Sequence, residues 1–259
     1  MIYFAFTVIS SIWTMLEVCV DSVDSAVSAA DGGADRLELC AALSEGGLTP
    51  SLGLLTTVKK LVQIPVFVLI RCRQGDFVYS SDDMDVMEAD IQSMKKAGAD
   101  GFVFGCLDES GAVDQDKCYQ LLRVAAPLSC TFHRAFDCTL HPEQALTTII
   151  KLGFVRLLTS GQAPSALEGA ALIGRLVSLS AGRLTVMPGG GVTPQTAPAL
   201  LRLTGVRELH ASARSARSSA LDMPAGVTMG AASDERHWLQ CDPAKVKAIK
   251  RAFVSGKED

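Results

Sequence analysis

Two cysteines stand at the ends of apolar stretches near the start of the chain. Cys19 lies in the stretch Leu16–Val20, and Cys40 closes the stretch Arg36–Cys40. Adjacent parallel strands lie about 4.8 Å apart, so two cysteines at equivalent heights could share one ligand. Two sulfur ligands with no nearby histidine suit Cu(I) better than a four-coordinate structural zinc site. The chemistry alone favours the alternative of two small buried side chains, because free cysteine is among the most buried residue types.

Two further residues could transfer protons. His133 lies at the end of the apolar stretch that begins at Ser129. A histidine there could act as a general acid–base or as an extra metal ligand. Glu45 lies in a segment with two glycines and a proline and is a candidate acid or base. The alternatives are an interior histidine that orders its loop and a solvated loop carboxylate. His210 presents the same choice as His133.

Arginines and glycines follow other apolar stretches and could bind an anion. Arginine forms paired hydrogen bonds with carboxylate or phosphate, and consecutive glycines let backbone N–H groups approach such a group closely. Each feature alone has a plain alternative, since surface arginines are common and glycine runs also simply turn the chain. Taken together they predict an anionic ligand. The candidate residues are Arg71, Arg134, Arg214, Gly189, Gly190 and Gly191.

Eight apolar, strand-like stretches alternate with helical patterns and must position these residues. Such alternation is typical of a parallel sheet covered by helices. We therefore predict an α/β fold, a single (β/α)8 TIM barrel whose site lies at the C-terminal ends of its strands, in preference to a doubly wound open sheet. The clearest helices are Asp82–Ala97 and Pro142–Lys151. The predicted strands are Leu16–Val20, Arg36–Cys40, Val66–Arg71, Gly101–Phe104, Ser129–Arg134, Val155–Thr159, Arg183–Met187 and Arg207–His210.

A weak repeat supports the barrel, and one long connection follows its last strand. A glycine that ends a helix comes within three residues of alternate strands, at Gly33, Gly98, Gly153 and Gly205. Glycine is the usual residue in the left-handed position after a helix. The connection from Ala211 to Asp242 is rich in small residues, and we expect a lid, a binding loop or disorder there.

Composition limits the partners and the compartment. The formal charge is −4 and the pI about 5.6, with no basic stripe, so neither nucleic acid nor a membrane surface is expected as a partner. Eight cysteines without a CxxC pair indicate reduced thiols in a cytoplasmic protein. Residues 1–14 form an apolar N-terminal extension that is too short to span a bilayer and lacks the basic residues of a signal peptide, which leaves 15–259 as the barrel domain.

Taken together, the strand-end motifs resemble the copper homeostasis protein CutC family over about residues 15–253. The motifs are Glu17-Val18-Cys19-Val20-Asp21-Ser22, Gly33-Ala34-Asp35-Arg36-Leu37-Glu38-Leu39-Cys40, Leu43-Ser44-Glu45-Gly46-Gly47, Ile70-Arg71 with Gly75-Asp76-Phe77, Thr131-Phe132-His133-Arg134-Ala135-Phe136-Asp137, Leu158-Thr159-Ser160-Gly161, Met187-Pro188-Gly189-Gly190-Gly191 and Ser212-Ala213-Arg214. The resemblance implies a TIM barrel, a cytosolic setting, homo-oligomers and a role in copper handling. It also implies that Cys19 and Cys40 are the leading Cu(I) ligands, which reverses the preference from chemistry alone. Cys72 stands where the family more often has proline and would add a third thiol near the barrel mouth.

We therefore predict a copper homeostasis protein that binds Cu(I) through cysteine thiolates, with copper as its ionic partner. The alternative is a TIM-barrel enzyme that acts on a small phosphorylated or carboxylated metabolite. In that alternative His133 and Glu45 transfer protons, while the arginines and Gly189–Gly191 hold the anion. A third interpretation is a scaffold whose barrel site has lost its chemistry.

Overall fold

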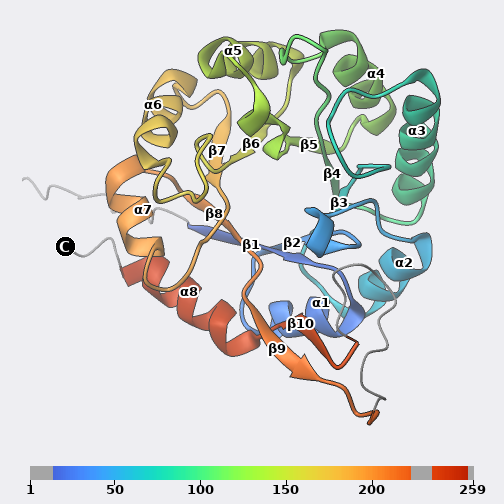
Figure 1. The fold of residues 1–259 in the computed structure, drawn as a ribbon, viewed down its shortest axis with the longest axis vertical. Helices are drawn as coiled ribbons and strands as arrows, with labels where there is room; N and C mark the ends of the chain where they lie inside the picture. Colours follow the sequence, from blue (N-terminus) through green and yellow to red (C-terminus); the bar gives the residue numbers. More distant parts are fainter. Residues whose placement is uncertain (1–13, 223–234, 256–259) are drawn as a thin grey trace, which may run out of the picture.

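Eight parallel strands form a ring in the computed structural model, which describes residues 14–222 and 235–255 (Figure 1). Neighbouring strands follow sequence order, and β1 pairs with both β2 and β8. An isolated parallel bridge between Gly189 and His210 joins the ends of β7 and β8. The strands are β1 (Met15–Val20), β2 (Arg36–Leu39), β3 (Val66–Leu69), β4 (Gly101–Phe104), β5 (Ser129–Phe132), β6 (Arg156–Thr159), β7 (Thr185–Pro188) and β8 (Glu208–Ala211). The predicted TIM barrel is thus confirmed.

Helices lie outside this ring and cover it (Figure 1). They are α1 (Val23–Asp31), α2 (Leu52–Leu61), α3 (Ser81–Lys96), α4 (Gln115–Ala125), α5 (Pro142–Leu152), α6 (Ala170–Ser180), α7 (Ala197–Thr204) and α8 (Pro243–Ser255), with short 3-10 helices η1 (Leu43–Glu45) and η2 (Arg134–Cys138). Helix α5 begins at Pro142, where proline's missing N–H is not needed. Ser51 caps α2 by accepting a hydrogen bond from the backbone N–H of Leu54. The two clearest predicted helices correspond to α3, whose N-terminus is capped by Ser80, and α5, and both predictions lie within a residue of the observed bounds.

Two glycines of the repeat precede aspartates that connect neighbouring strands at the N-terminal end of the barrel. Gly33 and Gly98 both adopt positive φ, and each is followed two residues later by an aspartate. Asp35 accepts a hydrogen bond from the backbone N–H of Leu16 at 2.8 Å. Asp100 accepts one from Val66 at 2.7 Å. Each aspartate therefore ties the start of its own strand to the start of the preceding one.

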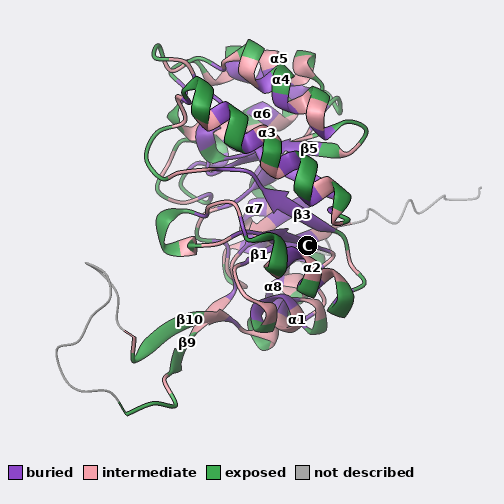
Figure 2. Ribbon diagram, turned by 90° about the vertical axis from the view of Figure 1, so that its right-hand side faces the viewer, coloured by how far each residue is buried: buried purple, intermediate pink, exposed green. Residues whose placement is uncertain are grey.

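The long connection after β8 differs from expectation. Its described ends form a two-stranded antiparallel sheet of β9 (Arg214–Ser218) and β10 (His237–Cys241) beside the barrel (Figure 2). The backbone N–H of Cys241 donates to Ser25 Oγ in α1, which anchors this hairpin to the helical layer. Residues 223–234, in the middle of the predicted lid or binding loop, lie outside the described residues.

The apolar N-terminal extension also lies outside the described part of the chain, apart from Thr14. No described helix is long and apolar enough to cross a membrane. All eight cysteines are described, and all are free thiols, in agreement with the predicted reduced state.

Candidate functional site

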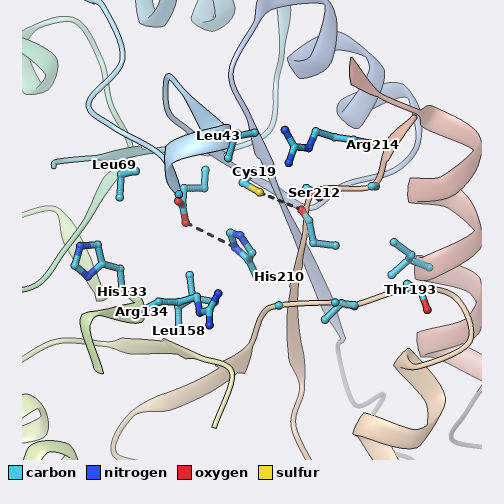
Figure 3. A pocket seen from close by; sticks show the side chains of 18 of the residues that line it. Cys19, Leu43, Leu69, His133, Arg134, Leu158, Thr193, His210, Ser212 and Arg214 are labelled. Carbon is cyan, nitrogen blue, oxygen red and sulfur yellow. Dashed lines mark hydrogen bonds and ion pairs between the residues drawn. The ribbon is translucent and has the colours of Figure 1, made fainter. Parts of the chain in front are cut away.

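A pocket of about 710 Å³ opens at the C-terminal ends of the barrel strands (Figure 3). Residues from five strands line its wall. They are Cys19 in β1, Glu38 in β2, Leu69 in β3, Leu158 in β6 and His210 in β8. Loops after the strands supply the rest of the wall. The pocket therefore lies on the face where the fold places its active sites.

The two candidate copper ligands lie at this end on neighbouring strands. Cys19 lines the pocket, and its thiol donates to the backbone oxygen of Ala211 at 3.6 Å. Cys40 is fully buried, donates to the backbone oxygen of Val20 at 3.5 Å and does not belong to the pocket wall. Burial, reinforced by Cys19, raises the pKa of the Cys40 thiol far above its usual value. The structure thus brings both thiols to one end of the barrel and leaves only Cys19 facing the pocket.

His210 lies beside Cys19 at the pocket floor (Figure 3). Its Nδ1 is 2.8 Å from Glu17 Oε1 and 3.7 Å from Glu38 Oε2. Burial lowers the pKa of His210, but Cys19 and Glu38 outweigh that effect and hold the pKa well above its ordinary value. When Cys19 is a thiolate, His210 is therefore an imidazolium whose Nδ1–H donates to Glu17.

Two buried glutamates flank this histidine and differ in charge state. Burial raises the pKa of Glu17, but Arg36 and His210 outweigh it and lower the pKa to about 2. Burial dominates for Glu38 and raises its pKa to about 7. One ligand atom from each of Glu17, Glu38 and His210 lies within 4.8 Å of the others, a spacing that a metal ion could bridge. Glu17 is bonded to Arg36 and His210, whereas Glu38 Oε2 is buried without a hydrogen-bond partner among the described residues.

An ion network extends from Glu17 into the barrel interior. Arg36 contacts Glu17 at 2.5 Å and Glu208 at 2.7 Å, and Arg156 contacts Glu208 at 2.7 Å. Both guanidinium groups lie over the ring of Phe67, at 5.2 and 5.5 Å from its centroid. Arg36 and Arg156 thus pair with two carboxylates, those of Glu17 and Glu208.

The candidate site residues predicted from the sequence do not include Glu17, Glu38, Arg36 and Glu208. A usable signal was present, because charged residues occupy every second position of otherwise apolar strands, as in Arg36-Leu37-Glu38-Leu39. Alternate residues of a strand point to the same face. Two charges on the inner face of a barrel strand therefore indicate an interior ion network.

His133 lines the pocket in a neutral form. The backbone N–H of Ala135 donates to its Nδ1 at 3.3 Å, which leaves the proton on Nε2. Burial, followed by the nearby Arg71, lowers the pKa of His133 to about 3. Phe77 packs edge-on against the imidazole, with ring centroids 4.9 Å apart. Nε2 is buried without a hydrogen-bond partner among the described residues.

Glu45 does not join His133 in the pocket wall. It lies in η1 with an exposed side chain. Its backbone oxygen, rather than its carboxylate, contacts the site, because it accepts a hydrogen bond from Arg71 at 2.8 Å. The proton-transfer role of Glu45 remains a prediction.

The three candidate arginines have different surroundings. Arg71 is buried and donates to backbone oxygens, those of Glu45 and Gly47 through Nη1 and that of Gly75 through Nη2, while its Nε has no hydrogen-bond partner among the described residues. It therefore holds two loops together. Arg134 and Arg214 also line the pocket (Figure 3), and Nε of Arg214 is buried without a hydrogen-bond partner among the described residues.

Two of the three predicted glycines line the pocket, and Cys72 does not. Gly190 and Gly191 line the pocket, whereas Gly189 lies against Leu158 and His210 at the end of β7. Cys72 does not belong to the pocket wall. Its thiol is 3.6 Å from Asp83 Oδ1, and burial raises its pKa to about 11.

Comparisons with known proteins agree with this architecture. Residues 14–215 match the model of the CutC family. A human copper homeostasis protein cutC homolog is 54% identical over 218 residues, which cover 84% of this chain and 80% of the human protein. The mouse homolog is 50% identical over 91% of this chain and 88% of its own length. A crystal structure of a candidate copper homeostasis protein CutC from Streptococcus agalactiae superposes with a TM-score of 0.74 at 30% identity, covering 77% of this chain and 98% of that one. The chain therefore belongs to the CutC family of copper homeostasis proteins.

Proposed function

We propose that this protein handles copper by binding one Cu(I) ion between the sulfur atoms of Cys19 and Cys40. The observation that carries the proposal is the placement of two free thiols at the C-terminal ends of adjacent parallel strands, with Cys40 two residues beyond Glu38, the register partner of Cys19. Each thiol donates to a backbone oxygen, at 3.6 and 3.5 Å, and Cys19 also interacts with the His210 side chain. These hydrogen bonds are weak, so little free energy is lost when a soft cation replaces both protons.

The charges around the thiols favour a thiolate–copper complex. Two thiolates and one Cu(I) carry a net charge of −1. The imidazolium of His210 lies beside Cys19, and the Arg214 guanidinium acts on Cys40 to lower its pKa against the effect of burial. Both cations therefore stabilise the complex more than the two neutral thiols.

The pocket gives copper a route to the site. Cys19 is the first thiol that an ion in the pocket meets. Cys40 lies in a small apolar cluster with Phe67 and Leu69, and Gly47 lies against it, since a Cβ added at Gly47 would be 3.7 Å from Cys40 Sγ. Cys19 then acts as the entry ligand and Cys40 as the second one. Because both thiols must lose a proton, binding strengthens as the pH rises.

The proposal extends to the setting of the protein. Eight free thiols suit the reducing cytoplasm, where Cu(I) is the stable oxidation state of copper in thiol sites. We also propose that the chain works as a homo-oligomer. Sedimentation of the purified full chain would test this: a single monomeric species at micromolar concentration would contradict it.

An anaerobic Cu(I) titration against a competing chelator tests the copper site. Cys19→Ser and Cys40→Ser should each abolish tight binding of one Cu(I) per chain. Cys138→Ser is the matched control, because Cys138 is the exposed cysteine and lies outside the pocket wall. Binding that survives both site substitutions, or that disappears with Cys138→Ser, would contradict the proposal.

A further inference from the structure

The pocket carries an excess of positive charge that a copper site does not require. Arg71, Arg134, Arg214 and Lys245 line it, against one carboxylate, that of Glu38. The chain as a whole has a net charge of −4, so this local excess of cationic groups is opposite in sign to the charge of the whole chain. A volume of about 710 Å³ also falls in the range of organic-ligand pockets and far exceeds the needs of a metal ion. Both features point to an organic anion.

The loop after β7 presents backbone donors to this pocket. Gly190 and Gly191 have φ values of +104° and +71°, in the region that favours glycine. Their carbonyl groups are engaged, since Gly190 accepts a bond from Ala166 N–H at 2.9 Å and Gly191 one from Thr196 Oγ1 at 3.3 Å. Among the hydrogen bonds between described residues, none has the N–H of Gly190 or Gly191 as donor. Successive free N–H groups of this kind form anion-binding concavities.

Arg134 is fixed against the same loop. Its Nε contacts Asp137 at 2.8 Å and its Nη2 donates to Ser160 Oγ at 2.9 Å. Nη1 makes no hydrogen bond to a described residue, and a methyl group added at Gly190 would lie 3.7 Å from it. The guanidinium is therefore held in place by two of its nitrogens, while the third, Nη1, lies near Gly190.

We propose that Gly190, Gly191 and Arg134 bind the phosphate group of a small organic phosphate monoester. Three donor groups converge here, which matches the three terminal oxygens of a phosphate monoester better than the two of a carboxylate. The apolar wall, with Leu69, Leu158 and Val192, accommodates the organic part.

This anion site shares the pocket with Cys19 but does not use a thiol, and it contains fewer residues than the anion-binding set predicted from the sequence. Arg71 spends three donors on loop carbonyls, and Gly189 lies outside the pocket wall.

Calorimetric titration of the copper-free full chain with phenyl phosphate, and separately with inorganic phosphate and with benzoate, tests the proposal. Phenyl phosphate should bind most tightly of the three. Arg134→Gln should weaken it roughly tenfold to a hundredfold, the range for losing a charged hydrogen-bond partner. Arg134→Lys keeps the charge and should lose less. Arg202→Gln, which removes one exposed charge from α7 outside the pocket, is the matched control and should bind as the wild type does.

Each other result would overturn a stated part of the proposal. No heat of binding from any of the three anions at millimolar concentration would remove the anion site. Equal losses in Arg134→Gln and Arg202→Gln would reduce it to a general charge effect. Tighter binding of benzoate than of phenyl phosphate would overturn the phosphate assignment. Phenyl phosphate binding to the copper-free chain and Cu(I) binding in the absence of phosphate are separate readouts, so this site and the copper site can fail independently.

Discussion

The neutral state of buried His133 makes a quantitative prediction about stability and pH. Burial lowers the pKa of this imidazole from 6.5 to about 3. Between these values the unfolded chain binds one more proton than the native protein, so the free energy of unfolding falls as the pH drops through that window. At pH 5 the contribution of this one group is a loss of about 2 kcal/mol relative to pH 7, from 1.36 kcal/mol per pKa unit over 1.5 units.

The substitution His133→Asn isolates that contribution. Asparagine cannot titrate, and its side-chain oxygen can still accept the hydrogen bond that Ala135 N–H donates to the histidine. The variant loses the packing of the imidazole against Phe77, so it should be less stable than the wild type at pH 7. Because only the wild type has the extra pH dependence, the difference in stability should shrink by about 2 kcal/mol when the pH is lowered to 5.

Urea unfolding of both proteins at a series of pH values measures this difference. His141→Gln is the matched control, because His141 is exposed, and its unfolding curve should track the wild type at every pH. A stability difference between wild type and His133→Asn that stays constant from pH 7 to pH 5 would refute the reasoning that His133 is buried in its neutral form.

Three further outcomes follow from particular contacts. Arg36→Met should destabilise the fold by roughly 3–5 kcal/mol in urea unfolding, because it leaves two buried carboxylates without their shared cation; a loss below about 1 kcal/mol would show that the network is hydrated. Ser51→Ala should cost about 1 kcal/mol by removing the cap of α2, and Ser51→Thr should restore most of it. Brief treatment of the native protein with iodoacetamide should alkylate Cys138 first and leave Cys40 unmodified, as mass spectrometry of the digested protein would show; early modification of Cys40 would contradict its burial.

The barrel could be predicted because its signals are local. Each strand is a short apolar run, and helix ends are marked by glycines such as Gly33 and Gly98. The hairpin of β9 and β10 was missed because its strands are largely exposed and polar, so they lack the apolar pattern that marked the barrel strands.

The site was predicted less completely because the hydrogen-bond partners of its side chains lie far away in the sequence. Arg71 has the right residue type for an anion clamp, but Glu45, Gly47 and Gly75 supply backbone oxygens that occupy it. The pairing of His210 with Glu17 joins residues 193 positions apart, through the register of β8 on β1. That register depends on closure of the whole barrel, which residue spacing alone does not determine.

X-ray absorption at the copper K-edge of the protein loaded anaerobically with one Cu(I) per chain tests the central proposal most directly. The proposal predicts a first shell of two sulfur atoms and no nitrogen or oxygen ligand, and loss of one sulfur in Cys40→Ser. A first shell dominated by nitrogen or oxygen, or a two-sulfur shell that persists in the Cys19→Ser/Cys40→Ser variant, would contradict it.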